Sequence, residues 1–172
     1  MTANLQWIGD RIAIADVMAR YTRGIDRCDL DALSSVWWPG ATADYGDGSV
    51  DALDWSAAAV TALAALNRTQ HFIGNLLVDI DGDTATAECY CRAYHEAPGP
   101  DGAPDAATAF EVGGRYLDRL ERRDDQWRIV HRRYVMDWNS NAPSTANWDD
   151  GLYARLTRRG TRHPADPLYT GS

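Results

Sequence analysis

The chain changes its hydrophobic period near residue 67, and this change divides it into a helical part and a strand-forming part. Before that point, apolar residues recur every three or four positions, which is typical of helices that bury one face. We expect three helices, over residues 4–22, 30–36 and 51–66. Asp29 is placed to cap the second helix, the Pro-Gly pair at 39–40 to end it, and residues 41–45 to form a short strand.

After residue 67, apolar and polar residues alternate, which predicts strands that bury one face. We expect four strands, over residues 71–80, 84–96, 109–122 and 126–138. The Asp-Gly-Asp sequence at 81–83 indicates a hairpin turn. Helices followed by strands that are joined largely by hairpins indicate an α+β fold, in which the helices pack against one face of a curved antiparallel sheet.

The last part of the chain, residues 139–172, is polar, contains prolines and carries one candidate helix at 149–159. We interpret it as a tail or a lid that follows a domain of residues 1–138. The whole chain has 172 residues, of which 45% are hydrophobic and 24% charged. This length and composition suffice to bury a core without disulfide or metal staples.

Charge and cysteine content narrow the functional classes. The net charge of −8 argues against a surface for nucleic acid or for anionic membranes. We find no apolar run of transmembrane length and no basic-then-apolar signal at the N-terminus, so we expect no membrane partner. The three unevenly spaced cysteines favour reduced thiols and a cytoplasmic location.

The candidate chemistry centres on Asp26 and His71. A carboxylate that orients a neutral imidazole makes a general base near neutral pH. Neither residue lies in a metal or nucleotide motif, so we expect proton abstraction without a cofactor if the two meet. The alternatives are a strand-end histidine bonded to a loop carbonyl and an aspartate at a helix end, although Asp29 fits the capping role better.

Tyr21 is a candidate proton donor, since a phenol can hydrogen-bond a developing enolate oxygen or protonate a leaving hydroxide. It precedes Asp26 by about one and a half helical turns, so the two share a face only if the helix loosens at Gly24. A core tyrosine is the alternative. His131 and Arg132 are neighbours on a strand and therefore face opposite sides, unless a bulge changes the alternation.

Several large side chains are candidates for the wall of a substrate pocket. An apolar pocket with few polar groups suits a hydrophobic ring substrate, although most of these residues would serve equally well in a core. The candidates are Trp37, Trp38, Tyr45, Tyr90, Tyr94, Met136 and Trp138, with Trp38 and Met136 ranked first. His95 and Glu96 close the second long strand, where we expect solvated side chains.

Five segments together resemble the SnoaL-like branch of the nuclear transport factor 2-like superfamily. They are residues 11–16, 21–33, 35–38, 71–75 and 116–129, and the resemblance spans residues 10–138. Within this branch the chain is most similar to three enzyme types: scytalone dehydratase, bile-acid dehydratase and hexachlorocyclohexane dehydrochlorinase. The resemblance implies a cone, in which a curved sheet wraps around the N-terminal helices and encloses a pocket.

The same resemblance assigns roles to residues of this sequence. The catalytic aspartate and histidine of such enzymes fall on Asp26 and His71. The dehydratases carry tyrosine at the place of Tyr21, where the dehydrochlorinase has lysine, and this difference counts against halide elimination. Arg132 matches an inward-facing arginine that can hold an anionic leaving group or a substrate carboxylate. If a bulge intervenes, His131 faces the substrate in its place.

We therefore expect a cofactor-independent lyase of the dehydratase type, or an isomerase, acting on a hydrophobic cyclic small molecule by Asp-His acid/base catalysis. The alternative is a non-catalytic ligand-binding module, such as a dioxygenase small subunit. A metal site of Asp26, His71 and His131 has no supporting ligand spacing. The open sheet face of this fold is usually covered by another subunit, so we expect a homo-oligomer, either a dimer or a trimer.

Overall fold

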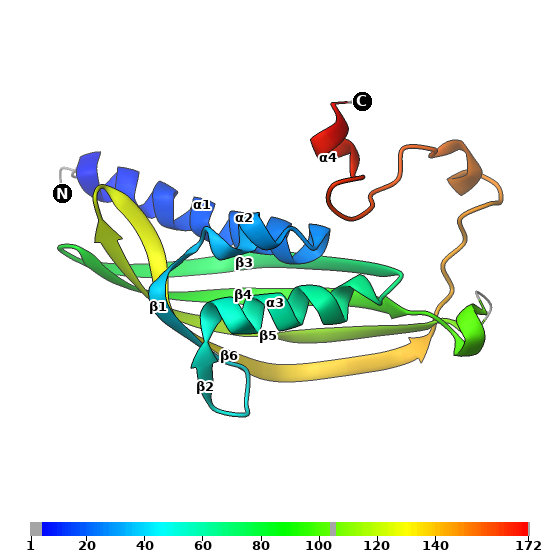
Figure 1. The fold of residues 1–172 in the computed structure, drawn as a ribbon, viewed down its shortest axis with the longest axis horizontal. Coiled ribbons are helices and arrows are strands. Elements are labelled where there is room, and N and C mark those ends of the chain that lie inside the picture. Colours follow the sequence, from blue (N-terminus) through cyan, green and yellow to red (C-terminus); the bar gives the residue numbers. More distant parts are fainter. Residues whose placement is uncertain (1–4, 104–105, 172) are drawn as a thin grey trace.

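The computed structural model describes residues 5–103 and 106–171, and it confirms the predicted α+β class. Three helices lie on one face of a curved, unclosed sheet: α1 (Leu5–Arg27), α2 (Leu30–Ser34) and α3 (Ala52–Ala64) (Figure 1). The sheet has the strand order β2-β1-β6-β5-β4-β3. Its strands are β1 (Trp37–Asp44), β2 (Ser49–Asp51), β3 (Arg68–Asp81), β4 (Thr84–Ala97), β5 (Thr108–Arg123) and β6 (Gln126–Pro143). All neighbouring strands pair antiparallel except β1 and β6, which pair parallel.

The first helix continues five residues beyond its expected end and carries Asp26 in its last turn. Gly24 allows α2 to pack closely against this added stretch of α1, because a Cβ at position 24 would lie 2.7 Å from the backbone nitrogen of Leu33 in α2. The chain then reverses at Cys28, whose φ is 51°. Asp29 caps α2 as predicted, since its carboxylate accepts a 2.9 Å hydrogen bond from the backbone of Ala32.

The prediction that Pro39 and Gly40 end the second helix is wrong. Helix α2 ends at Ser34, and both residues lie inside β1. The pairing of β1 with β6 shifts register between Trp37 and Thr42, and Gly40 has a φ of 79°. An irregular stretch of this kind accepts a proline because no ladder hydrogen bond is required there.

The two hairpins that join the long strands follow the sequence pattern. Gly82 adopts a φ of 58° between β3 and β4, and Asp124 and Asp125 adopt φ values of 50° and 59° between β5 and β6. Strand β6 runs to Pro143, so the proposed domain end at residue 138 falls within it.

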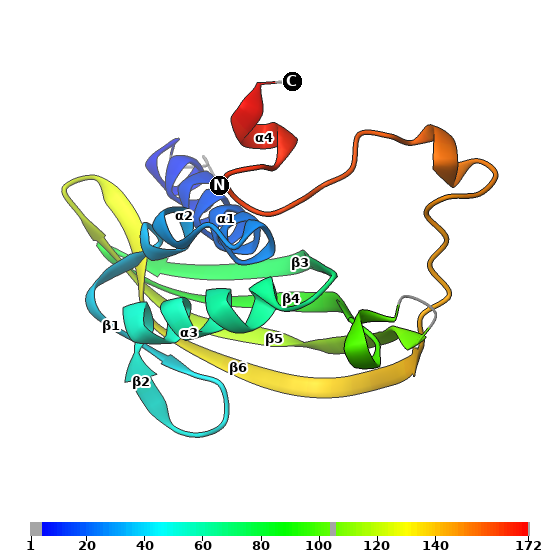
Figure 2. The same cartoon turned by 45° about the vertical axis from the view of Figure 1, so that its right-hand side comes forward.

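The C-terminal segment is mostly irregular. The predicted helix at 149–159 is wrong, because only a 3₁₀ turn at Tyr153–Arg155 forms there. Its side chains are almost all exposed, so no buried face stabilises a longer helix. A short helix, α4 (Pro167–Thr170), ends the segment close to the C-terminal end of α1 (Figures 1 and 2).

The core lies between the helices and the concave face of the sheet. Small residues on β4 alternate inward and allow α1 to approach closely, so that large α1 side chains fill the space. These small residues are Ala85, Ala87, Cys89, Cys91 and Ala93, and the α1 side chains are Ile14, Val17, Met18, Tyr21 and Ile25. Among the helices of the described residues, none is long and apolar enough to cross a membrane.

Candidate active site

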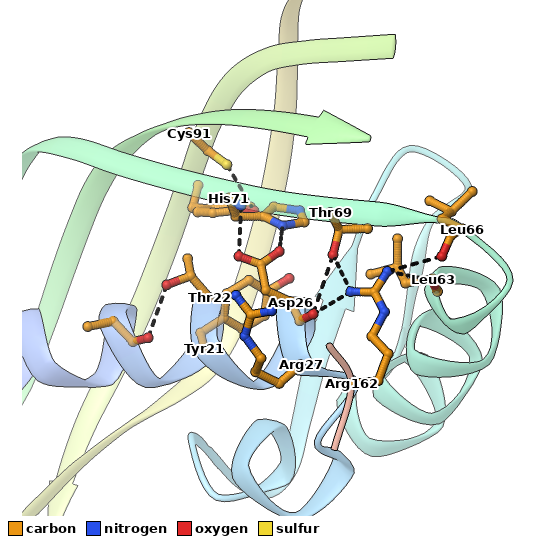
Figure 3. A network of polar contacts seen from close by, with 12 residues as sticks. Tyr21, Thr22, Asp26, Arg27, Leu63, Leu66, Thr69, His71, Cys91 and Arg162 are labelled. Atoms are coloured by element: carbon orange, nitrogen blue, oxygen red, sulfur yellow. Dashed lines mark hydrogen bonds and ion pairs between the residues drawn. The ribbon is translucent and has the colours of Figure 1, made fainter. Parts of the chain in front are cut away.

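Asp26 and His71 meet where the last turn of α1 crosses β3 (Figure 3). One carboxylate oxygen lies 2.7 Å from Nδ1 of His71, and the other accepts a 2.8 Å hydrogen bond from the backbone N–H of His71. Each side chain is only 9% exposed. Because Nδ1 faces a carboxylate, it carries the proton, and the lone pair of the neutral ring is on Nε2.

The carboxylate of Asp26 remains ionised in this setting. Burial alone would raise its pKa, but the hydrogen bonds and charge of His71 outweigh burial and place the pKa below its ordinary value. At neutral pH, Asp26 therefore acts as a fixed negative charge beside the imidazole. This is the arrangement that stabilises an imidazolium once His71 has accepted a proton.

A second imidazole, His95 on β4, lies beside the pair. Its ring is edge-on to His71 at a centroid distance of 5.3 Å and stacks on Phe110 at 4.6 Å. The residue is 7% exposed, and its Nδ1 has no hydrogen-bond partner among the residues that the structure describes. Burial, followed by the proximity of His71, lowers the pKa of His95 to about 4, so the ring is neutral.

The prediction of solvated side chains at the end of β4 is wrong for both His95 and Glu96. Phe110 of the neighbouring strand covers His95, while Glu96 is 5% exposed and accepts a 2.7 Å hydrogen bond from Ser144. Every second residue of β4 from Ala85 to Ala93 points inward, and position 95 continues this alternation. This alternation was the signal in the sequence that could have identified His95.

Tyr21 points into an aromatic cluster instead of hydrogen-bonding the Asp26–His71 pair. Its hydroxyl lies 2.5 Å from the hydroxyl of Tyr45, which stacks on Trp55 at 4.2 Å and on Tyr134 at 5.5 Å. Burial raises the pKa of both Tyr21 and Tyr45, so both phenols keep their protons. Only one of the two protons is used in the bond between the hydroxyls, and the other has no acceptor among the residues that the structure describes.

Arg132 is fully buried and faces the same aromatic cluster. Its guanidinium makes two 2.7 Å hydrogen bonds to Asp118 and lies between the rings of Tyr21 and Tyr116, 4.0 Å from each centroid. The remaining nitrogen, Nη1, is buried and has no hydrogen-bond partner in the described part of the chain. The charge of Arg132 is thus already balanced by Asp118.

His131 lies on the opposite, outer face of the sheet. The register of β5 and β6 shifts between Ile129 and His131, and Arg132 follows Trp127 and Ile129 as the next buried residue of β6. The prediction that a bulge would turn His131 inward in place of Arg132 is therefore wrong, because the irregularity has the opposite effect. The His131 ring hydrogen-bonds Thr42 at 2.8 Å and borders an outer hollow of about 710 Å³. His131 therefore does not join Asp26 and His71, and no group of three or more metal-ligating side chains forms among the described residues.

The candidate wall residues divide between two places. Trp37 is buried, donates a 3.0 Å hydrogen bond to Ser56 and packs edge-on to Tyr21, so it belongs with Tyr45 in the aromatic cluster. Met136 follows Arg132 and Tyr134 on one side of β6 and is 56% exposed.

Trp38 and Tyr94 lie away from this cluster. The Trp38 indole donates to the backbone of Glu121 and lies under the guanidinium groups of Arg123 and Arg128. Tyr94 alternates with the inward His95 and donates to Glu96 on the outer side. Trp38 and Tyr94 therefore do not belong to the aromatic cluster around Tyr21.

Residues 7–133 match the SnoaL-like domain family. The chain belongs to this family. Uncharacterized proteins of Mycobacterium tuberculosis and Mycobacterium bovis are each 30% identical to it over 131 residues, which cover 73% of this chain and 84% of theirs. The predicted resemblance to the SnoaL-like branch is confirmed.

Solved structures support the same fold. A Kribbella flavida protein gives a TM-score of 0.68 at 26% identity, covering 77% of this chain and 93% of its own. A hexachlorocyclohexane dehydrochlorinase from Novosphingobium barchaimii gives 0.69 at 18% identity, covering 83% and 95%. A scytalone dehydratase-like protein from Novosphingobium aromaticivorans gives 0.66 at 17% identity, covering 81% and 91%. At the identities of the last two, the likeness establishes the fold alone.

Proposed function

We propose that this SnoaL-like protein is a cofactor-independent lyase of the dehydratase type, or an isomerase, whose substrate is a hydrophobic cyclic small molecule. The observation that carries the proposal is the double contact between Asp26 and His71. Family membership and structural neighbours named as dehydrochlorinase and scytalone dehydratase-like support the reaction class. Family membership alone does not decide the reaction class, since one fold serves many functions.

In the proposed reaction, Nε2 of His71 removes a proton from a carbon next to a carbonyl group. The imidazolium that forms is stabilised by the ionised carboxylate of Asp26. General-base catalysis of this kind contributes about 10²–10⁴-fold to the rate. In a dehydratase, the electron pair left on carbon expels a hydroxyl group from a neighbouring carbon, and this group takes the proton from His71 and leaves as water. In an isomerase, the electron pair shifts through the enolate, and another carbon takes the proton back from His71.

Three further groups have proposed roles. The neutral ring of His95 offers a hydrogen bond to the substrate next to His71. The pair Tyr21 and Tyr45 supplies the unused phenol proton to a substrate oxygen. Arg132 acts as a positioning residue, because its guanidinium fixes the Tyr21 ring and its charge is balanced by Asp118.

The test is deuterium uptake from D₂O into cyclic ketones, followed by NMR, because it detects proton abstraction from any ketone that enters the site. We expect Asp26→Asn and His71→Ala to slow the uptake by about 10²-fold or more. Asp16→Asn, an exposed position on the same helix, is the matched control and should exchange at the wild-type rate. Equal uptake by wild type and His71→Ala for every responsive ketone would reject the proposal.

A non-catalytic module is the second candidate, and the burial of Arg132 and Tyr21 favours it. Neither side chain exposes more than 1% of its surface, so two of the four expected catalytic groups are enclosed by protein. Such a module holds a ligand or pairs with a catalytic subunit. Stable co-purification with an iron-bearing large subunit, without deuterium uptake by any ketone, would favour it.

We also propose a homo-oligomer, formed through the outer face of the sheet. Phe72, Leu77 and Tyr90 are 73%, 66% and 47% exposed on this face. The same face carries two ion pairs, Arg92–Glu111 and Arg115–Asp137. A surface with apolar residues and both charge signs complements a second copy of itself. Either a dimer or a trimer satisfies this arrangement.

A further inference from the structure

The C-terminal segment returns across the molecule and attaches to the end of α1 (Figures 1 and 2). We refer to residues 160–169 as the strap. Its backbone N–H at His163 donates a 2.7 Å hydrogen bond to the carbonyl of Arg27, and the hydroxyl of Tyr169 donates one of 2.7 Å to the carboxylate of Asp29. The strap is thus held on both sides of the turn that follows Asp26.

Between these two anchors, the side chain of Arg162 enters a junction of three elements (Figure 3). Its Nη1 donates to the backbone carbonyl of Asp26 and, at 2.7 Å, to the hydroxyl of Thr69 on β3. Its Nη2 donates to the carbonyls of Leu63 at 3.1 Å and of Leu66 at 3.4 Å. The three carbonyls lie at or beyond the C-terminal ends of α1 and α3, where helices leave acceptors unsatisfied and favour a positive charge.

We propose that Arg162 is a positioning residue for the Asp26–His71 pair, which deepens the proposed function and rests on it. The guanidinium holds the main chain of Asp26, while His71 holds its carboxylate. It also holds Thr69, which precedes His71 by two residues on the same side of β3. One charged group therefore joins the main chain of Asp26 to the side chain of Thr69, two residues before His71, and the strap carries that group.

The residue type suits this role. A guanidinium is planar, always charged and carries five donors in a fixed fork, so it can serve four acceptors at one junction. Lysine presents a single compact ammonium group and cannot span the two helix ends and β3 at the same time. Arg159 provides a matched contrast in the same tail, since its guanidinium contacts Trp148 and Asp149 and none of the junction residues.

The experiment measures the exchange rate of the His71 Nδ1 proton by NMR in wild type, Arg162→Ala, Arg162→Lys and Arg159→Ala. We expect Arg162→Ala to accelerate this exchange by at least about tenfold, which corresponds to about 1.4 kcal/mol. Free guanidinium ion should restore protection in Arg162→Ala, whereas methylammonium should not. Arg159→Ala should match wild type.

Wild-type exchange in Arg162→Ala would overturn the proposal, as would equal acceleration in Arg159→Ala. If Arg162→Ala does not fold, Arg162→Lys decides, because full protection in that variant would show that the fork of donors is not needed. The readout does not depend on turnover. A failure of His71→Ala to slow deuterium uptake would reject the proposed function while leaving this measurement intact.

Discussion

At the scale of single residues, burial and partners decide what a polar group can do. His71 and His95 carry the same imidazole 5.3 Å apart, yet one is held by a carboxylate and the other lies against Phe110 with an unpartnered nitrogen among the described residues. The family resemblance predicted that Arg132 holds an anionic leaving group or a substrate carboxylate, but Asp118 already occupies two of its donors. The role of a polar side chain therefore depends more on its hydrogen-bond partners than on its residue type.

Removing Arg132 should destabilise the fold strongly. In Arg132→Met, the carboxylate of Asp118 remains buried without its two donors, and loss of one partner of a buried pair costs about 3–5 kcal/mol. Urea unfolding measures the loss. Arg133→Met is the control, because Arg133 is exposed on the outer face and its removal should change the stability little. Equal midpoints for the two variants would contradict a structural role of Arg132.

His95 should make stability depend on pH below neutrality. Its folded-state pKa is about 4, below the ordinary value of 6.5, so the unfolded chain binds the proton more readily. The stability is therefore full above pH 6.5 and is lost as pH falls toward 4, by up to about 3 kcal/mol. Urea unfolding between pH 7 and pH 4.5 should show a shallower loss for His95→Phe. The same loss of stability with falling pH in wild type and in His95→Phe would refute this effect.

At the scale of elements, close approach at small residues sets where the site residues lie. The turn between α1 and α2 places Asp26 opposite β3 because α2 folds back against Gly24. The sequence predicted both helices and the Asp29 cap, since these depend on local period and composition. The sequence did not predict that α1 extends to Arg27. A glycine followed by charged residues usually indicates the end of a helix, and here the helix continues because α2 packs against it.

Gly24→Ala tests this close approach. The added Cβ would lie 2.7 Å from the backbone nitrogen and 2.9 Å from the Cα of Leu33, so backbone must move. We expect a destabilisation of about 1–3 kcal/mol, measured by chemical unfolding. Gly9→Ala in the same helix is the matched control: its Cβ meets nothing within 4 Å, and the substitution should stabilise by about 0.5–1 kcal/mol. Unchanged stability of Gly24→Ala would contradict the prediction and show that α2 moves away without cost.

At the scale of the whole molecule, the two faces of the sheet have different surroundings. Helices cover the concave face of the sheet (Figure 2). The outer face carries the exposed side chains of Phe72, Leu77 and Tyr90. The strap joins α1, α3 and β3 through Arg162. The two faces thus divide the proposed roles into chemistry inside and association outside.

If copies of the chain associate through the outer face of the sheet, a charge introduced there should weaken the oligomer. Phe72→Glu places a carboxylate in the proposed contact between copies and should weaken it by at least about tenfold, or about 1.4 kcal/mol. Sedimentation over a range of protein concentrations measures this change. Leu5→Glu, an 84% exposed position on α1, should leave the assembly unchanged. A wild-type protein that stays monomeric at all concentrations would reject the oligomer.

Local pattern was enough to predict the three N-terminal helices, the four long strands, the hairpin at Gly82 and the alternation along β4, because side-chain direction repeats with a fixed period. It missed the short elements β2 and α4. The sequence also singled out Asp26 and His71, but their 2.7 Å contact joins residues 45 positions apart. That contact, the register shift that turns Arg132 inward, and the return of Arg162 to α1 emerge only in the folded chain. Each depends on packing between distant segments, which no local pattern encodes.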